Sequence, residues 1–386
     1  MNITNNVKYI GVNDKEIRLF ESQYDVPNGM SYNSYIISGK NINIILDTVD
    51  KRKTDEWIKN VEEALKEKKP DYLVISHLEP DHSANIKLIT DKYPEIKIIS
   101  NEMTFKLLPQ FFDITNLDDR KIVVKEAEEL KFDNITLQFF MAPMVHWPEV
   151  MFTYYKEEKV LFSADAFGKF GTLDTNEDWD CEARRYYFNI VGKYGIQVQA
   201  VLKKLLNIDI NYICPLHGPV LKENLEYYID KYNTWSSYKP EDEGIFIAYA
   251  SIHGNTETAA KRLKELCEQN GIKKVSISNL VTDDLAEAIE DAFRYDKLIV
   301  AASSYNGEVF PPMEHFLNSL RAKNYQNRKI AIIENGTWAP SAGRTMKEII
   351  DNMKNINLCK KIVTIKTTMN EQTEQEMNEL IKEILN

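Results

Sequence analysis

The stretch Asp71-Tyr-Leu-Val-Ile-Ser-His77-Leu-Glu79-Pro-Asp81-His82 contains four potential metal ligands within six residues. The apolar run 72–75 predicts a buried strand. The residues from Ser83 onward begin with a capping residue and continue with helical spacing. We therefore expect His77, Glu79, Asp81 and His82 in a loop between a strand and a helix, where neighbouring side chains can converge. Histidine combined with carboxylate suits transition metals. The alternative is a solvated acidic turn in which the two histidines are incidental.

Length, charge and cysteine spacing limit the class of protein. A chain of 386 residues exceeds what one hydrophobic core usually supports, so we expect two domains. The net charge of -11, without any basic block, argues against nucleic acid and against anionic membrane surfaces as partners. The polar N-terminus lacks the features of a signal peptide, and no apolar run approaches the ~18 residues of a membrane span. The four cysteines are far apart and form no CxxC pair, which predicts reduced thiols in a cytoplasmic protein: Cys181, Cys214, Cys267 and Cys359.

The first part of the chain has a mixed α/β pattern. Up to about residue 165, many short β-like runs are interrupted by helical stretches at 54–66, 83–92 and 102–109, and a longer helical zone follows at 181–206. This pattern predicts two packed sheets with helices outside. The polar segment 230–244 is the best candidate for a domain boundary, and we expect domains at 1–240 and 241–386.

The second part alternates strictly between strands and helices. Five apolar runs, each followed by a helical stretch, predict strands at 244–250, 274–279, 297–302, 329–334 and 361–366. This alternation is typical of a doubly wound parallel sheet.

Three more metal-competent residues follow apolar strands in the first part of the chain. They are His146 in the run MAPMVHWPEV, Asp165 in LFSADAFG and His217 in YICPLHGP. Each of them alone is more readily interpreted as a hydrogen-bonded structural residue. Their repetition at strand ends favours a shared metal site, because the ends of several strands can meet on one rim of a sheet sandwich.

The order of these residues resembles that of the metallo-β-lactamase superfamily, whose usual loop reads HxHxDH. Here Glu79 occupies the place of the second histidine. The resulting pattern of HxExDH, then His, Asp and His, is similar to that of the flavodiiron proteins, the members that reduce oxygen and nitric oxide. The resemblance covers nearly the whole chain. It implies an N-terminal metallo-β-lactamase-like αββα sandwich followed by a C-terminal flavodoxin-like doubly wound parallel sheet.

The resemblance also implies a ligand set. One iron would be held by His77, Glu79 and His146, the other by Asp81, His82 and His217, with Asp165 as the bridge; family members differ in whether the residue matching His82 contacts the metal. Two carboxylate ligands and a bridging carboxylate independently favour iron, because their negative charge stabilises higher oxidation states, whereas zinc hydrolases prefer histidine-rich sets. Tyr194 and Trp147 are candidates for residues beside the metals, Tyr194 as a proton donor, although both could equally be aromatic core.

Three loops at strand ends of the second part predict a flavin site. The first is Ser251-Ile252-His253-Gly254-Asn255-Thr256, which is similar to the flavodoxin phosphate loop for FMN, with His253 in place of a hydroxyl residue. No P-loop motif with lysine is present, so a triphosphate is not expected. Alone, this loop could be a generic capped helix. The others are Ser303-Ser304-Tyr305-Asn306-Gly307 and Asn335-Gly336-Thr337-Trp338, at the strand ends where a doubly wound sheet binds its ligand. Tyr305 or Trp338 could stack on the flavin ring or pack on the surface.

The function that the resemblance implies is a reductase. Electrons from an external donor would pass through FMN to a non-haem diiron site that reduces oxygen to water, nitric oxide to nitrous oxide, or both. No rubredoxin-like CxxC pair is visible, so we expect the minimal two-domain class, with a donor that acts in trans, as a rubredoxin-like protein or a reduced deazaflavin. The expected assembly is a head-to-tail homodimer or a dimer of dimers. The alternatives are a zinc-dependent hydrolase with an accessory flavodoxin domain and an electron carrier whose metal site is structural.

Overall fold

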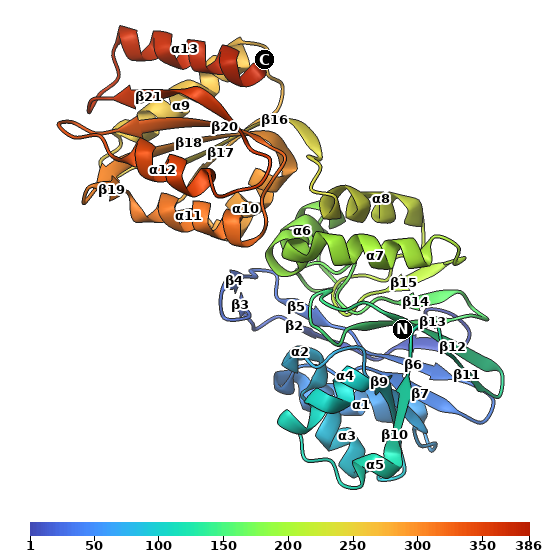
Figure 1. The fold of residues 1–386 in the computed structure, drawn as a ribbon. Coiled ribbons are helices and arrows are strands. Elements are labelled where there is room, and N and C mark those ends of the chain that lie inside the picture. The colour runs from blue at the N-terminus through green and yellow to red at the C-terminus, as the bar shows by residue number, and fades with distance from the viewer. The chain divides into compact units, whose positions relative to one another are not determined.

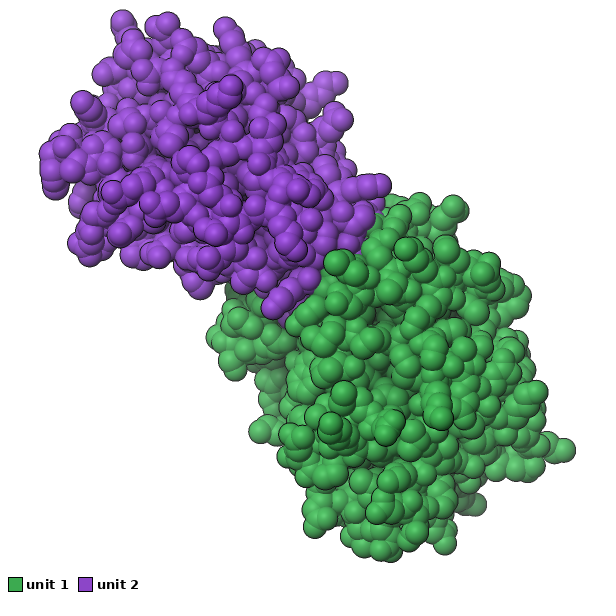
Figure 2. All heavy atoms as spheres, viewed as in Figure 1, with its two compact units in different colours: residues 1–187, 194–233 green, residues 188–193, 234–386 purple.

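The computed structural model describes residues 1–386, which form two compact units (Figure 2). Unit 1 comprises residues 1–187 and 194–233, and unit 2 comprises residues 188–193 and 234–386. The division lies close to the expected boundary between residues 240 and 241. The assignment of the short segment 188–193 to unit 2 was not expected from the sequence. No helix is both long and apolar enough to cross a membrane.

Unit 1 is built on two main sheets, and both mix parallel with antiparallel pairing. The six-stranded sheet has the order β1 (Val7–Tyr9), β6 (Tyr35–Ser38), β7 (Asn43–Leu46), β8 (Tyr72–Val74), β9 (Lys97–Asn101), β10 (Lys121–Val124). The five-stranded sheet has the order β11 (Glu129–Phe132), β12 (Ile135–Met141), β13 (Met151–Tyr155), β14 (Val160–Phe162), β15 (Tyr212–Cys214). Two small antiparallel pairs add β2 (Val12–Asp14) with β5 (Met30–Tyr32) and β3 (Leu19–Phe20) with β4 (Tyr24–Asp25).

The helices of unit 1 flank the sheets on two sides (Figure 1). On the side of the six-stranded sheet are α1 (Thr54–Leu65), α2 (Pro80–Ser83), α3 (Ile86–Lys92), α4 (Glu102–Leu107) and α5 (Leu117–Arg120). Beside β14 and β15 are α6 (Trp179–Tyr186), α7 (Gly195–Leu205) and α8 (Leu225–Ser236). This is the helix–sheet–sheet–helix sandwich that the sequence predicted.

The core of unit 1 lies between its two sheets. Alternate residues of a strand face the same side, and the inward residues include Ile44 and Leu46 of β7 and Leu137 and Phe139 of β12, all fully buried. Each such side chain stabilises the fold by roughly 1.5–3 kcal/mol. The sandwich therefore provides a rigid support for the loops at its rim.

Unit 2 is a parallel sheet with the order β17 (Val275–Asn279), β16 (Asp242–Ala250), β18 (Tyr295–Tyr305), β20 (Lys329–Asn335), β21 (Asn357–Ile365), and β19 (Glu308–Val309) pairs antiparallel with β18. This is the 2-1-3-4-5 order of flavodoxin-like sheets. One face carries α9 (Asn255–Gln269) and α13 (Glu371–Leu385); the other carries α10 (Leu285–Arg294), α11 (Pro311–Ala322) and α12 (Ala342–Ile350) (Figure 1). The predicted doubly wound sheet is thus present.

The segment 188–193 belongs to unit 2 through aromatic and polar contacts. The rings of Phe188 and Phe293 stack with centroids 4.2 Å apart. Asn189 donates a hydrogen bond to the carbonyl of Ala286 and accepts one from Lys323 at its own carbonyl. The helical zone expected at 181–206 is present, and between α6 and α7 its backbone forms a π-helix at Tyr187–Val191 and a 3-10 turn at Gly192–Tyr194.

Candidate metal centre and flavin pocket

The seven predicted metal ligands all follow the carboxyl ends of strands in unit 1. His77 follows β8, His146 follows β12, Asp165 follows β14 and His217 follows β15. Strands β12 and β14 are both antiparallel to β13, and β15 is parallel to β14, so the carboxyl ends of β12, β14 and β15 share one rim. The strand pairing therefore brings together side chains that are far apart in the sequence.

The prediction that all four clustered ligands lie in a loop was wrong for two of them. Asp81 and His82 are not in an open loop but in the short helix α2, which begins at Pro80. Proline is favoured at a first helical position because its fixed φ suits the helix and its missing N–H needs no partner there. Glu79 is the residue that caps this helix, so the turn sets the relative directions of Glu79, Asp81 and His82.

The first of two ligand groups consists of His77, Glu79, His146 and Asp165, with one ligand atom of each lying within 4.8 Å of the others. The Nε2 atom of His146 is 2.8 Å from Glu79 Oε2 and 2.9 Å from Asp165 Oδ2. The Nε2 atom of His77 is 3.2 Å from the same Asp165 oxygen. Nitrogen and oxygen ligands therefore converge on one point.

The second group consists of Asp81, His82 and His217 and meets the same distance limit. Asp81 Oδ2 is 3.1 Å from His217 Nε2 and 3.5 Å from His82 Nε2. The other Asp165 oxygen, Oδ1, is 3.8 Å from His217 Nε2. Asp165 thus faces both groups, one carboxylate oxygen toward each.

Backbone carbonyls orient two of the imidazoles. His217 Nδ1 is 2.7 Å from the carbonyl oxygen of Ser31, and His82 Nδ1 is 3.4 Å from that of Thr48. A carbonyl oxygen only accepts, so each Nδ1 carries the hydrogen, and each ring can present an unprotonated Nε2 at the other end. These two Nε2 atoms lie 3.1 Å apart. A hydrogen-bonded Nδ1 is the usual arrangement for metal-binding histidine.

Burial makes this cluster costly unless its charge is compensated. His77, Asp165 and His217 are fully buried. The Asp165 and Asp81 carboxylate oxygens and both ring nitrogens of His77 have no hydrogen-bond partner outside the ligand cluster. Buried polar atoms without partners cost free energy. Burial also excludes the alternative of a solvated acidic turn.

The pKa values of the cluster point to a missing positive charge. Burial lowers the pKa of His77, but the carboxylates of Asp165, Asp81 and Glu79 outweigh it and raise that pKa to about 10. Burial raises the pKa of Glu79 to about 7, with the Asp81 charge adding to it. Without a cation, a proton on His77 balances part of the carboxylate charge. Divalent cations would take over that role, because metal binding displaces protons from its ligands.

Two buried carboxylates that the sequence did not single out support the ligand loops. Asp47 lies after β7, and its Oδ1 accepts a hydrogen bond from the Ser76 backbone N–H at 2.7 Å. Burial raises its pKa to about 6, while the charge of His77 opposes this rise. Glu149 accepts a hydrogen bond from the Leu78 N–H at 2.9 Å, and its own carbonyl accepts one from Asn101 at 2.6 Å. Glu149 therefore connects the loop of His146 to the loop of His77 and Glu79.

Aromatic rings surround the ligand imidazoles. Phe20, Tyr32 and Tyr186 lie with ring centroids 5.4, 5.9 and 5.5 Å from that of His217. Burial, with the nearby carboxylates of Asp165 and Glu79, raises the pKa of Tyr186 well above its usual value. The sequence pointed to Trp147 and Tyr194 instead. Trp147 lies beside His146, with ring centroids 6.5 Å apart.

Tyr194 lies at the N-terminal cap of α7 and is half-buried. Its proposed role as a proton donor stays a prediction, and Tyr186 is a second candidate for that role. The signal for Tyr186 was weak, because it lies in an aromatic run, 186–188, whose three members are all buried, and the sequence does not show which of them faces the ligands.

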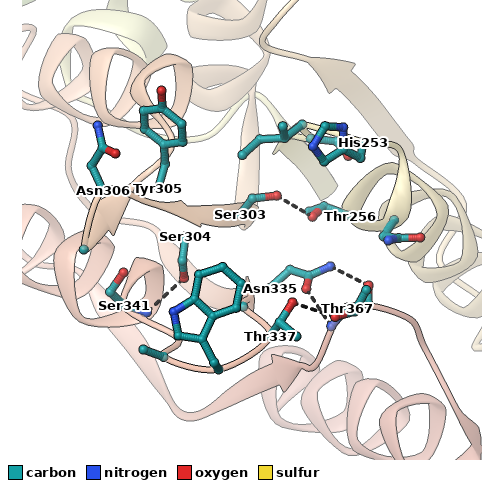
Figure 3. A pocket seen from close by; sticks show the side chains of 17 residues that line it. His253, Thr256, Ser303, Ser304, Tyr305, Asn306, Asn335, Thr337, Ser341 and Thr367 are labelled. Atoms are coloured by element: carbon teal, nitrogen blue, oxygen red, sulfur yellow. Dashed lines mark hydrogen bonds between the residues drawn. The ribbon is translucent and has the colours of Figure 1, made fainter.

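The three predicted flavin loops line a single cavity of about 640 Å³ in unit 2 (Figure 3). Of the predicted residues, Gly254 alone is absent from the lining; its N–H donates to Ser251 Oγ at 3.0 Å and it caps α9 with a φ of 90°. The sequence missed Ala339, Ser341 and Thr367. Thr367 follows β21, a strand end that was not considered.

Hydrogen bonds between the loops shape this cavity (Figure 3). Thr256 Oγ1 and Ser303 Oγ are 2.9 Å apart, and the Ser341 N–H donates to Ser304 Oγ at 2.9 Å. At another part of the lining, the side chain of Asn335 donates a hydrogen bond to the carbonyl of the neighbouring Thr367 at 3.0 Å. The aromatic side chains at the rim are open, with Tyr305 45% and Trp338 91% exposed. A planar ligand can therefore contact them without displacing core residues.

Known proteins share both units in the same order. A family model described as ODP family beta lactamase matches residues 30–218, and a flavodoxin domain model matches residues 246–362. An uncharacterized protein of Methanocaldococcus jannaschii is 31% identical, with 92% of this chain and 90% of that protein covered. The flavo-diiron protein FprA2 of Clostridium acetobutylicum is 27% identical, with 92% and 91% covered. The anaerobic nitric oxide reductase flavorubredoxin of Vibrio vulnificus is 28% identical, with 88% and 70% covered.

A solved structure has the same fold. The rubredoxin oxygen:oxidoreductase of the anaerobe Desulfovibrio gigas superposes with a TM-score of 0.92 at 23% identity, with 100% of this chain and 97% of that chain covered. The two family models, the full-length relatives and the order of the two units agree. The chain belongs to the flavodiiron family of oxidoreductases, whose cofactors are FMN and a non-haem diiron centre.

Proposed function

We propose that this protein reduces oxygen to water, nitric oxide to nitrous oxide, or both, at the ligand cluster of unit 1, with electrons that enter through FMN in unit 2. The observation that carries the proposal is the position of Asp165. One of its oxygens faces His77 and His146, and the other faces His217. A carboxylate shared between two ligand groups suits a pair of metal ions rather than one.

The donor set suits iron. Three carboxylates and four imidazoles meet in a buried site. The carboxylates supply negative charge that offsets two divalent cations and stabilises a higher oxidation state, whereas zinc hydrolases prefer histidine-rich sets. We propose that one iron is held by His77, Glu79 and His146, the other by Asp81, His82 and His217, and that Asp165 bridges them.

The cavity of unit 2 suits FMN. It lies at the carboxyl ends of the strands around the switch point between β16 and β18, where a flavodoxin-like sheet binds its flavin. Its phosphate end would be the loop 251–256 at the start of α9, because a helix N-terminus presents free N–H groups to an anion. The open side chains of Tyr305 and Trp338 would contact the flavin ring.

When bound, the flavin and the paired irons supply the electrons for the reduction of the gas. The protein holds the metals in a buried cluster and supplies protons. The Tyr186 hydroxyl keeps its proton throughout the neutral range, because burial and nearby carboxylates raise its pKa. Its O–H is therefore available beside the ligand cluster as a hydrogen-bond donor.

Metal analysis tests the proposal. Protein purified from cells supplied with both iron and zinc should contain two irons and one FMN per chain. Two zincs without iron, together with esterase, thioesterase or lactamase turnover, would establish the hydrolase alternative. Iron and FMN without any oxidation of the reduced protein by either gas would leave the electron-carrier alternative.

The electron donor, the assembly and the cellular compartment are proposed from the family and from the chain's own residues. We propose a donor in trans, either a rubredoxin-like protein or a reduced deazaflavin, and a head-to-tail dimer or a dimer of such dimers. We also propose that the protein acts in the cytoplasm, which the buried free thiols of Cys214, Cys267 and Cys359 support. Steady-state turnover of each gas with each donor tests the donor assignment.

A further inference from the structure

The two imidazoles of the second ligand group are held with different firmness. His217 Nδ1 lies 2.7 Å from the carbonyl oxygen of Ser31, and the next residue, Gly218, donates its N–H to Ser31 Oγ at 2.7 Å. The corresponding contact of His82, from Nδ1 to the carbonyl oxygen of Thr48, is 3.4 Å long, beyond the usual range for an N–H···O hydrogen bond. The ring of His82 is therefore the less firmly fixed of the two.

The side chain of Tyr32 packs against both of these imidazoles. Tyr32 is the last residue of β5 and is fully buried. Its ring centroid lies 6.1 Å from that of His82 and 5.9 Å from that of His217, and the ring planes are inclined at 67° and 66°. Edge-to-face contact of this kind is a preferred arrangement of aromatic rings. Because Tyr32 borders both imidazoles, its position limits how far the ring of His82 can turn.

The hydroxyl end of Tyr32 is held by Arg52. Arg52 Nη2 donates a hydrogen bond to the Tyr32 hydroxyl oxygen at 2.6 Å. Two carboxylates hold the guanidinium in turn, since Arg52 Nε lies 3.1 Å from Asp50 Oδ1 and 3.4 Å from Asp14 Oδ2. A guanidinium presents five N–H donors in a fixed plane, so it can bind carboxylates and a hydroxyl at the same time.

The two carboxylates that hold Arg52 are themselves fixed by backbone groups. Asp50 caps the short 3-10 helix Lys51–Lys53 by accepting the Arg52 backbone N–H at 2.8 Å. Asp14, on β2, is buried and accepts the N–H groups of Glu16 and Ile17 at 3.0 and 3.1 Å. A continuous series of contacts therefore runs from these acids through the guanidinium and the tyrosine ring to a predicted iron ligand.

We propose that Arg52 is a positioning residue for the second iron, and that through Tyr32 it keeps the ring of His82 in the ligand position. This inference rests on the proposed pair of irons and on the proposed ligation of one of them by Asp81, His82 and His217. It concerns His82 alone, because His217 has its own short contact with the backbone. Loss of Arg52 therefore weakens the binding of one iron and spares the other.

Anaerobic titration of the full chain with ferrous iron, after removal of bound metal and in competition with a chelator, tests this inference. The proteins are wild type, Arg52→Met, Tyr32→Phe and the double variant. Each single variant should bind one of its two irons about tenfold more weakly and the other as wild type does, because a group that orients a metal ligand is lost. The double variant should bind no more weakly than the single ones, since both substitutions remove the same hydrogen bond.

Two further comparisons separate positioning from a general loosening of the fold. In a chain that carries His82→Ala, the additional substitution Arg52→Met should cause no further loss of iron affinity, because the ring that Arg52 positions is gone. Lys53→Met is the matched control. Lys53 is the neighbour of Arg52 and also faces Asp14, at 3.9 Å, whereas the hydrogen bond to Tyr32 comes from Arg52. This control should bind both irons as wild type does.

Unchanged iron affinity in Arg52→Met, equal weakening of both irons, an additive loss in the double variant, or a loss that persists in full beside His82→Ala would overturn the inference. Should Tyr32→Phe fail to fold, Arg52→Met with and without His82→Ala still decides the matter, because the Arg52 side chain is 44% exposed and lies outside the core. Binding of fewer than two irons by wild type would instead overturn the proposed iron pair. The two failures are therefore distinguishable.

Discussion

At the scale of single residues, the metal centre depends on two buried carboxylates with different roles, Asp165 and Glu149. Asp165 is fully buried, and the polar atoms that its carboxylate oxygens face are the Nε2 atoms of His146, His77 and His217, at 2.9, 3.2 and 3.8 Å. Glu149 is buried as well, but its carboxylate accepts a backbone hydrogen bond and so has a structural role beside the cluster. Replacement of these two residues should therefore have different effects on iron binding.

Replacement of Asp165 by alanine should remove iron from the protein but leave FMN bound. The variant loses the one group that faces both ligand sets, whereas the flavin cavity lies wholly within unit 2. Iron content, flavin content and thermal unfolding measure the effect. Asp118→Ala is a matched control in unit 1, since this exposed aspartate pairs only with Lys121. Retention of two irons by Asp165→Ala would contradict the assignment of the bridge.

Replacement of Glu149 by alanine should weaken iron binding by about 10- to 100-fold, the usual cost of losing a group that orients metal ligands. The Leu78 N–H loses its acceptor, which loosens the loop between His77 and Glu79. Glu149→Gln keeps an oxygen at the same position and should retain near-normal affinity. Competition with a chelator gives the affinities. Equal iron loss in both variants would mean that the charge, rather than the hydrogen bond, is what matters.

At the scale of elements, the phosphate loop depends on the left-handed conformation of Gly254. Gly254→Ala should strain the loop by about 1 kcal/mol and lower FMN affinity several-fold without affecting iron. Gly271→Ala is the matched control, because Gly271 follows the other end of α9, has a φ of 84° and also has open space around it. Thermal unfolding should show similar destabilisation in both variants, and flavin titration should show weaker binding only in the first. Equal FMN affinities would show that the loop is not the phosphate site.

The elements of unit 2 were predictable from sequence because each strand is a compact apolar run with polar residues at its end. The predicted strand 329–334, for example, is observed as Lys329–Asn335, and the predicted strand 244–250 as Asp242–Ala250. The ligand residues were predictable because histidine and carboxylate follow such runs. The seven residues come together in the structure as the resemblance implied.

Other features depend on contacts that the local sequence does not encode. The short strand β19 is defined by its pairing with β18, and Thr367 joins the flavin cavity only because β21 lies beside β20. The π-helix at Tyr187–Val191 interrupts a run with good helical pattern because Phe188 and Asn189 have partners in unit 2. Glu149 lacks a motif altogether; its partner, the Leu78 N–H, is distant in sequence.

At the scale of the whole molecule, the proposed head-to-tail dimer would place the FMN of one chain beside the irons of the other, so that each working pair of sites would be shared between two chains. A chain with Asp165→Ala keeps FMN and lacks iron, and a chain with a disrupted 251–256 loop keeps iron and lacks FMN. Mixed after dissociation and reassociation, the two inactive proteins should regain roughly a quarter of wild-type activity, because half of the dimers are mixed and each contains one complete pair of sites. Absence of any recovery, with mixed dimers confirmed by mass spectrometry, would show that each chain uses its own pair of sites.

The most direct measurement is the anaerobic reaction of the fully reduced protein with oxygen or nitric oxide in a stopped-flow spectrophotometer, followed at the flavin absorbance. Wild type with two irons should be reoxidised by at least one of the gases within seconds. Asp165→Ala, which keeps FMN, should be reoxidised at least tenfold more slowly, a loss of about 1.4 kcal/mol or more in transition-state stabilisation. Equal rates for the two proteins with both gases would contradict the claim that the carboxylate-bridged iron pair reduces the gas.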